Sequence, residues 1–138
     1  MKSISYEELR ICSKTFEEYN DCTVIALSVV TELPYSFCHS LLKKAGRKQG
    51  KGFERSKTLN ALRSIGFTIE DVTDFFRDGL KIKSTKSFSK KSLIIPKDWR
   101  LLIYTRGHVA GTHGGNVIDW SAFRQNHIHK IYIIKEKI

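Results

Sequence analysis

The most continuously apolar stretch of the chain follows Cys22, and nearly every residue from there to Thr31 is apolar or small. A segment that is apolar all round is typical of a buried helix, although periodicity alone leaves a buried strand open. Asn20 or Asp21 can cap its N-terminus, because a short side-chain oxygen accepts hydrogen bonds from free first-turn amides. We therefore predict a buried helix that begins at Cys22.

Apolar residues at three- and four-residue spacing predict two further helices. Pro34 suits the first turn of one helix, and Gly46 is expected to end it. The other is predicted over about residues 56–65, with Gly66 as its stop signal. The loop between these helices, AGRKQGKGFERS, carries three glycines among basic residues.

After Gly66 the apolar residues alternate with polar ones, as they do in strands. The strand-like runs are residues 67–72, 101–105, 108–112, 116–120 and 128–134. Residues 73–92 are ambiguous, apart from a short polar helix that residues 84–92 could form. Helices followed by strands predict an α+β fold, in which N-terminal helices pack on a C-terminal antiparallel sheet. Because the chain has neither a repeat nor a linker, we expect one domain over residues 1–138.

Length and composition place the chain among globular proteins. It has 138 residues, of which 41% are hydrophobic, enough to build one core. Three cysteines are too few for a disulfide framework. No apolar run approaches the ~18 residues of a membrane span, and the segment MKSISYEELR lacks the apolar stretch of a secretion signal. We therefore expect a soluble cytoplasmic protein with no membrane contact.

The formal net charge of +10 favours an anionic partner. The cations gather in two segments, residues 43–57 and 77–100. The first contains a single acid, Glu54, and seven cations: Lys43, Lys44, Arg47, Lys48, Lys51, Arg55 and Lys57. These residues form either a solvated face or a docking surface for nucleic acid or an acidic protein.

Cys22 is the first candidate for chemistry. At the start of a buried helix, the helix dipole and the free amides stabilise negative charge and lower the pKa of a thiol. A thiolate in that position is a nucleophile once an imidazole can protonate the leaving group. Of the other two cysteines, Cys38 lies on the apolar face of its predicted helix, and Cys12 has no distinguishing context.

His108 is the matching imidazole, and a predicted hairpin brings a carboxylate to it. If His113 and Gly114 form the turn, His108 stands opposite Asp119 on the same face of the sheet. If the turn is Gly114–Gly115, Asp119 stands opposite Ala110 instead, and Asn116 becomes a weaker candidate for the third residue. A carboxylate beside the imidazole would fix its tautomer and stabilise its charged form.

Three segments together resemble the papain-like cysteine peptidase superfamily, most of all its small branch around the bacteriocin-leader peptidases and short phage-encoded proteins. The segments are NDCTVIAL around Cys22, LLKKAGR after it, and RGHVA around His108 through Asp119-Trp120. The resemblance implies a papain-like fold, with Cys22 as nucleophile, His108 as general base and acid, and Asp119 as the orienting residue. It implies hydrolysis or transfer at an amide, isopeptide or thioester bond of a protein or peptide, with no cofactor. A phage-encoded member would act in the host cytoplasm on a host protein.

The chain departs from that family at the oxyanion position. The family usually carries a Gln six residues before the nucleophile, and here that residue is Phe16. The replacement donor could be Asn20, Thr15 or the backbone amide of Cys22. If none of them serves, the alternative function is a catalytically inactive papain-like binding module that uses its basic faces.

Two other patterns are weaker. His127 and His129 lie two residues apart, but no further metal ligand stands at suitable spacing, so we expect no metal site. Gly50 and Gly52 lack the Gly-Lys-Ser/Thr ending of a phosphate loop, so we expect no nucleotide there.

Overall fold

The computed structural model describes residues 5–122 and 124–136. Its helices are α1 (Tyr6–Thr15), α2 (Cys22–Thr31), α3 (Tyr35–Lys44), α4 (Arg55–Ser64) and α5 (Thr85–Lys90), with a π-helical turn at Phe75–Gly79 and a 3-10 turn at Ser92–Ile94. The strands are β1 (Phe67–Asp71), β2 (Arg100–Thr105), β3 (His108–His113), β4 (Asn116–Val117) and β5 (Ile128–Glu136). None of the helices in the described part of the chain is long and apolar enough to cross a membrane.

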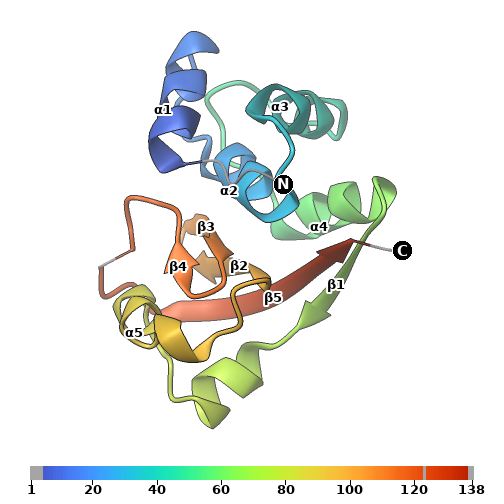
Figure 1. The fold of residues 1–138 in the computed structure, drawn as a ribbon. Helices are drawn as coiled ribbons and strands as arrows, with labels where there is room; N and C mark the ends of the chain where they lie inside the picture. The colour runs from blue at the N-terminus through green and yellow to red at the C-terminus, as the bar shows by residue number, and fades with distance from the viewer. Residues whose placement is uncertain (1–4, 123, 137–138) are drawn as a thin grey trace.

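The five strands form one antiparallel sheet in the order β1-β5-β2-β3-β4. Helices α1 to α4 lie on one side of this sheet, and α5 lies on the other side with the turns that flank it (Figure 1). Four helices come first and most of the sheet follows, so the predicted α+β fold is confirmed.

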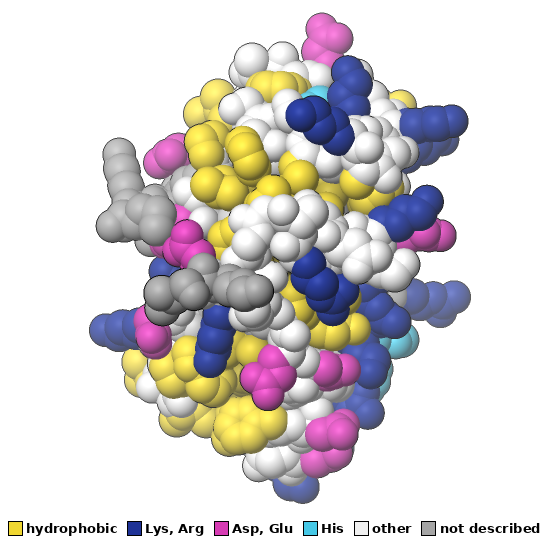
Figure 2. All heavy atoms as spheres, turned by 90° about the vertical axis from the view of Figure 1, so that its right-hand side faces the viewer, with side chains coloured by type: hydrophobic (Ala, Val, Ile, Leu, Met, Phe, Trp, Pro, Cys, Tyr) yellow, Lys and Arg dark blue, Asp and Glu magenta, His cyan; other side chains and the backbone are white. Residues whose placement is uncertain are grey.

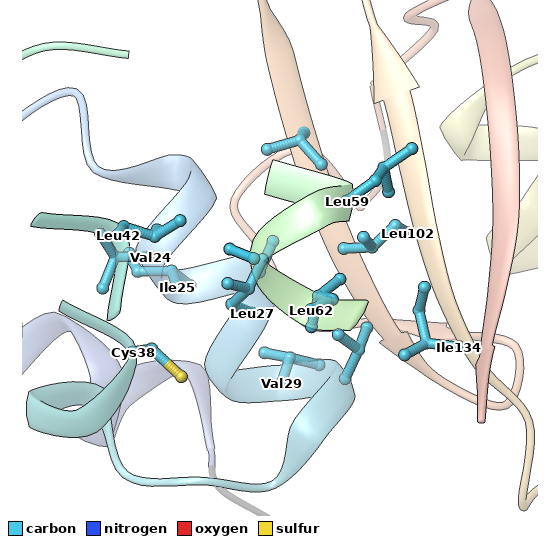
Figure 3. Packing of buried hydrophobic residues seen from close by; sticks show 14 of the residues in the cluster. Val24, Ile25, Leu27, Val29, Cys38, Leu42, Leu59, Leu62, Leu102 and Ile134 are labelled. Atoms are coloured by element: carbon cyan, nitrogen blue, oxygen red, sulfur yellow. The ribbon is translucent and has the colours of Figure 1, made fainter. Parts of the chain in front are cut away.

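The main core lies between the helices and the sheet (Figure 3). It is built around α2, a helix in which every residue after Cys22 is buried. The buried side chains that surround α2 include Leu9, Cys38, Leu42, Leu59, Leu62, Leu102, Val109 and Ile134. The prediction of a buried helix rather than a buried strand is therefore correct.

A second core fills the opposite face of the sheet. Leu101 and Ile103 point to that face, where they pack with Phe76, Phe88 and Ile95. Because both faces are covered, three consecutive residues of β2, Leu101 to Ile103, are all buried. The sequence pattern did not predict this second cover, because the segment that builds it was ambiguous.

The approach of α2 to β3 sets the position of everything near Cys22. The two elements run in the same direction: His113 at the end of β3 donates a hydrogen bond from Nε2 to the Val29 carbonyl near the end of α2 (3.0 Å). Between these ends Gly111 lies so close to α2 that a Cβ there would be 2.8 Å from the Ala26 carbonyl oxygen. A glycine is therefore required at this contact.

A buried ionic cluster anchors the segment that leads into α2. The Glu18 carboxylate accepts two hydrogen bonds from Arg47 (2.9 and 3.1 Å), one from the Gly50 amide (2.9 Å), and contacts His39 (2.6 Å). Burial raises the pKa of Glu18, but these donors outweigh it and lower the pKa to about 2. The cluster joins the end of α1 to α3 and to the loop after it.

Three details of the predicted elements differ from the structure. Helix α1 was not predicted, because its residues are mostly polar and only Leu9 is buried. Strand β4 has two residues rather than five. Asp21 occupies the N-cap of α2, but its carboxylate accepts a hydrogen bond from Tyr35 (2.7 Å) and leaves the first-turn amides of α2 uncapped.

We expect Gly111→Ala to lower the free energy of unfolding by about 1–3 kcal/mol, because the new methyl group overpacks the contact between α2 and β3. Gly52→Ala is the matched control, since a Cβ there meets no atom within 4 Å. Urea denaturation measures both variants. Equal stability of the two variants would contradict the close packing of α2 on β3.

Glu18→Gln should lower the free energy of unfolding by about 3 kcal/mol, because it leaves the buried Arg47 guanidinium without its charge partner. The exposed Glu17→Gln is the control. The pKa of Glu18 is lower in the folded protein than in the unfolded chain, so its stabilisation is present above about pH 4.3 and is lost as the pH falls through about 2. In urea denaturation the gap between wild type and Glu18→Gln should therefore narrow over this pH range, and a constant gap would contradict this assignment.

Candidate functional site

Cys22 is the first residue of α2, at the helix end where the backbone amides are free. Its thiol is mostly buried, between His108 and the backbone amide of Val109. The packing of α2 along β3 produces this contact, since the start of the helix lies beside the start of the strand. Cys22 thus combines an uncapped helix N-terminus with a neighbouring imidazole.

His108 is the first residue of β3, directly after the two-residue turn Arg106–Gly107. Gly107 has a φ of 68°, a conformation that glycine adopts without strain. The turn brings the imidazole back over the start of α2. His108 Nε2 donates to Asp119 Oδ2 at 2.6 Å, which leaves Nδ1 as the ring nitrogen available to the thiol.

The β3–β4 hairpin has the second of the two predicted registers, the one with its turn at Gly114–Gly115. Thr112 pairs with Val117, and His113 pairs with Asn116, so the turn is Gly114–Gly115 and the register that placed Asp119 opposite His108 is wrong. Asp119 still meets His108, because β4 ends at Val117 and the chain after it leaves the regular ladder. Asn116 is exposed in β4, and the carboxylate on the imidazole belongs to Asp119.

Ser121 holds the carboxylate of Asp119, and the sequence analysis missed it. Its backbone amide (3.1 Å) and its hydroxyl (2.5 Å) both donate to Asp119 Oδ2, the oxygen that also binds His108. Asp119 is 9% exposed and Ser121 is fully buried, so these donors replace water. The pattern Asp-x-Ser, in which an Asp side chain binds the backbone two residues later, was the available signal.

Trp120, between them, lies on the outside of the site. It is 53% exposed, and its ring stands 4.8 Å from the His108 ring, centroid to centroid. The Arg124 guanidinium in turn lies 5.4 Å from the centre of the indole. The indole therefore covers one side of the imidazole from solvent.

The electrostatics favour a thiolate–imidazolium pair. Burial raises the pKa of Cys22, but His108, the Val109 amide and the Thr23 hydroxyl together lower it below its usual value. Burial lowers the pKa of His108, but Asp119 and the neighbouring Cys22 raise it to about 9. The imidazole is thus protonated at neutral pH, next to a thiol that gives up its proton more easily than usual.

The other two cysteines lack this setting. Burial raises the pKa of Cys38 to about 11, despite a contact with the Thr31 hydroxyl. Cys12 is partly buried against the main core, with no imidazole among its described partners. Only Cys22 therefore has the environment of a reactive thiol among the three.

The Cys22–His108–Asp119 group opens into a cleft of about 810 Å³, which we call the main cleft. Its walls come from the ends of α1 and α2, the β2–β3 turn and the chain between β4 and β5. The lining residues are Tyr6, Asn20, Asp21, Cys22, Ile25, Gly52, Thr105, Arg106, Gly107, His108, Asp119, Trp120, Gln125, Asn126, His127 and His129. This volume falls within the range of about 300–1,000 Å³ that is typical of ligand-binding sites.

The oxyanion candidates differ in position. Thr15 is exposed, and its hydroxyl donates to the Ile11 carbonyl at 2.9 Å, so it does not reach the cleft and its assignment is wrong. Asn20 lines the main cleft, where its Nδ2 donates to the Gly50 carbonyl at 3.2 Å and keeps a second hydrogen. The Cys22 amide remains at the uncapped start of α2.

Phe16, at the position of the family's glutamine, packs in the core against Tyr35 and His39 rather than in the cleft. The site therefore has two available donors, the backbone amide of Cys22 and the side chain of Asn20.

The first basic segment is a surface feature, with one correction. Lys43, Lys44, Lys48, Lys51, Arg55 and Lys57 are exposed, and Lys57 lies 3.6 Å from Glu54. Arg47 is 5% exposed and neutralises Glu18, so its assignment to a partner-binding surface is wrong. Lys and Arg side chains occur over both the helical layer and the sheet layer, with Asp and Glu side chains interspersed among them (Figure 2).

His127 and His129 both line the main cleft, with their ring centres 5.7 Å apart. Within residues 5–122 and 124–136, no group of three or more His, Cys, Asp or Glu side chains is placed to hold a metal ion.

Three comparisons with known proteins found no match: no protein-family model fits the chain, no curated protein sequence matches it, and no solved structure matches its fold. The resemblance to papain-like peptidases stays a prediction from the sequence.

Proposed function

We propose that the protein is a papain-like thiol hydrolase that cleaves an amide, isopeptide or thioester bond of a protein or peptide. One observation carries the proposal: the Cys22 thiol, at an uncapped helix N-terminus, adjoins an imidazole that a buried carboxylate binds at 2.6 Å. Cys22, His108 and Asp119 are thus adjacent in the sequence of contacts that acyl transfer requires: a nucleophile, an acid–base group and a group that orients it.

In the first step the Cys22 sulfur attacks the carbonyl carbon of the substrate. An S–C bond forms, the bond to the leaving group breaks, and His108 gives its proton to the departing nitrogen, oxygen or sulfur. Asp119 keeps the charged imidazole in place during this step, and Ser121 keeps Asp119 in place. The product of the step is an acyl-thioester on Cys22.

In the second step His108 takes a proton from water, which attacks the thioester and releases the acid. An amine in place of water would make the same step a transfer. In both steps negative charge develops on the carbonyl oxygen. The Cys22 amide and Asn20 are the donors for this charge, and loss of one such donor typically costs ~100-fold or more in rate.

The place of action and the origin of the chain belong to the same proposal. The resemblance to short phage-encoded proteins supports a cytoplasmic enzyme that acts on a host protein, and three free cysteines fit a reducing compartment.

The direct test is the hydrolysis of N-acetylglycine p-nitrophenyl ester. We expect a burst of p-nitrophenol and a mass increase of one acetylglycyl group on Cys22, because acylation of this activated ester is fast. Cys22→Ala should lose both signals, and Cys12→Ala, the matched control, should keep them. Equal hydrolysis by Cys22→Ala would refute the proposal, because Cys22 would not be the nucleophile. The absence of both signals in the wild type would refute it as well and would favour the catalytically inactive binding module.

The thiolate–imidazolium pair predicts a distinctive pH profile of iodoacetamide alkylation. Because the pKa of Cys22 is lowered, its rate at pH 7 should be at least ~10-fold above that of Cys38, whose pKa is raised to about 11. The rate should change near pH 9, as the imidazolium of His108 loses its proton. Peptide mass spectrometry follows the three cysteines separately.

Two variants separate the orienting groups in the same measurement. Asp119→Asn should move the rate change near pH 9 to lower pH, because the imidazolium of His108 loses the carboxylate that stabilises its charge. Ser121→Ala should do the same to a smaller extent, because Asp119 loses a hydrogen bond. The exposed Asp98→Asn is the control. If the rate change stays near pH 9 in both variants, Asp119 does not stabilise the charge on His108.

A further inference from the structure

A second, smaller cleft is also lined by Cys22. It measures about 280 Å³, and we call it the side cleft. Its walls include Phe53, Arg55, Tyr104 and Thr105, and it shares Cys22 and His108 with the main cleft. Because both clefts meet at the thiol, a peptide that crosses Cys22 would place one side chain in the side cleft and continue into the main cleft.

The size of the side cleft fits one side chain rather than a whole ligand, since pockets for drug-sized molecules measure about 300–1,000 Å³. Its lining includes Phe53, Tyr104 and Val109, which supply apolar contact for the stem of a side chain.

In the described part of the chain, the side cleft is lined by a positive charge and by no carboxylate. Arg55 is its single lysine or arginine, and no Asp or Glu is among the described residues that line it. The neighbouring acid, Glu54, is oriented toward Lys57, 3.6 Å away, rather than toward Arg55. The Arg55 guanidinium lies 5.9 Å from the centre of the Tyr104 ring, a cation–π contact that holds it beside the cleft.

One hydroxyl group of the cleft lining lacks a partner. Thr105 Oγ1 is buried with no hydrogen-bond partner among the described residues. A buried hydroxyl without a partner is unfavourable, and an oxygen atom of a ligand beside Thr105 would supply one.

The main cleft adds no competing acid. Its two carboxylates, Asp21 and Asp119, are buried and bound to Tyr35 and to His108 respectively. A negatively charged substrate segment therefore meets no free carboxylate among the residues that line either cleft.

We propose that the side cleft is a subsite for an acidic side chain of the substrate, Asp or Glu, whose carboxylate binds Arg55. This inference rests on the proposed function and specifies its substrate class: a polypeptide with an acidic residue next to the scissile bond. Arg55 is then a specificity-determining residue that contacts substrate outside the reacting atoms.

The test compares two vinyl sulfone probes, acetyl-Ala-Glu and acetyl-Ala-Gln vinyl methyl sulfone. The Cys22 sulfur adds to the vinyl carbon that is attached to the peptide, β to the sulfonyl group. An S–C bond forms, the π bond of the C=C group breaks, and the carbon next to the sulfonyl group takes the proton of His108, with no leaving group. We expect the Glu probe to label Cys22 about tenfold faster than the Gln probe at low salt, because a carboxylate makes charge-assisted hydrogen bonds with a guanidinium.

Arg55→Gln should bring the two rates together, and Arg55→Lys should restore part of the difference, because it keeps the charge without the planar fork. Arg63→Gln is the matched control. It removes the same charge from the same helix, outside the side cleft, leaves Glu54 with Lys57, and should keep the tenfold ratio. Thermal denaturation confirms that each variant is folded.

The outcomes separate the two proposals. If Cys22 reacts with neither probe, and with iodoacetamide no faster than Cys12, the thiol hydrolase itself is wrong. If both probes label Cys22 at equal rates, the hydrolase stands and the acidic subsite is wrong. If the Glu probe reacts faster but Arg55→Gln keeps the ratio, another cation binds the carboxylate and the assignment to Arg55 is overturned.

Discussion

The structure depends on the close packing of α2 against β3. Gly111 has no side chain, so the Ala26 carbonyl and the Val29 side chain can lie where a Cβ would otherwise be. The helix can therefore run flat along the strand, with its first residue beside the first residue of the strand. A larger residue at position 111 would push these two elements apart, and with them the thiol and the imidazole.

At the site that this contact creates, burial and charge pairing have opposite effects on the pKa values of Cys22 and His108. Burial alone would keep Cys22 as a neutral thiol and His108 as a neutral imidazole, because a low dielectric disfavours charge. The Asp119 carboxylate raises the pKa of His108 and so favours the charged imidazole, and His108 in turn lowers the pKa of Cys22 and favours the thiolate. Ser121 is part of the same balance, since its two hydrogen bonds satisfy a carboxylate that is almost entirely removed from water.

The sequence predicted the α+β fold and the buried helix well, because apolar periodicity depends on local spacing. It also brought Cys22, His108 and Asp119 forward as candidates. The hairpin register was harder, because the turn sequence His-Gly-Gly allows two registers, and the one that predicted the contact with Asp119 is wrong. The contact forms because β4 is short, and the length of a strand at the edge of a sheet depends on what packs against it.

The other two failures have different causes. Thr15 lies seven residues before Cys22, but its hydroxyl donates to the Ile11 carbonyl within α1, a helix that the sequence analysis did not predict. Arg47 stands among six exposed cations in the sequence, and nothing in that segment shows that Glu18, 29 residues earlier, removes it from the surface. This pairing depends on how the end of α1 packs beside α3, which local composition does not encode.

This pairing also changes what the excess of positive charge means. A net charge of +10 attracts anionic partners at a distance, but screening reduces that attraction beyond roughly 8 Å at physiological salt. At contact distance the decisive question is which cations lack a nearby carboxylate. Arg47 has Glu18 and Lys57 has Glu54, whereas Arg55 lies against an aromatic ring at the edge of the thiol site. Of these three cations, Arg55 is the one that lines a cleft together with Cys22. Under the proposed function, the net positive charge of the chain would draw acidic partners toward this cleft.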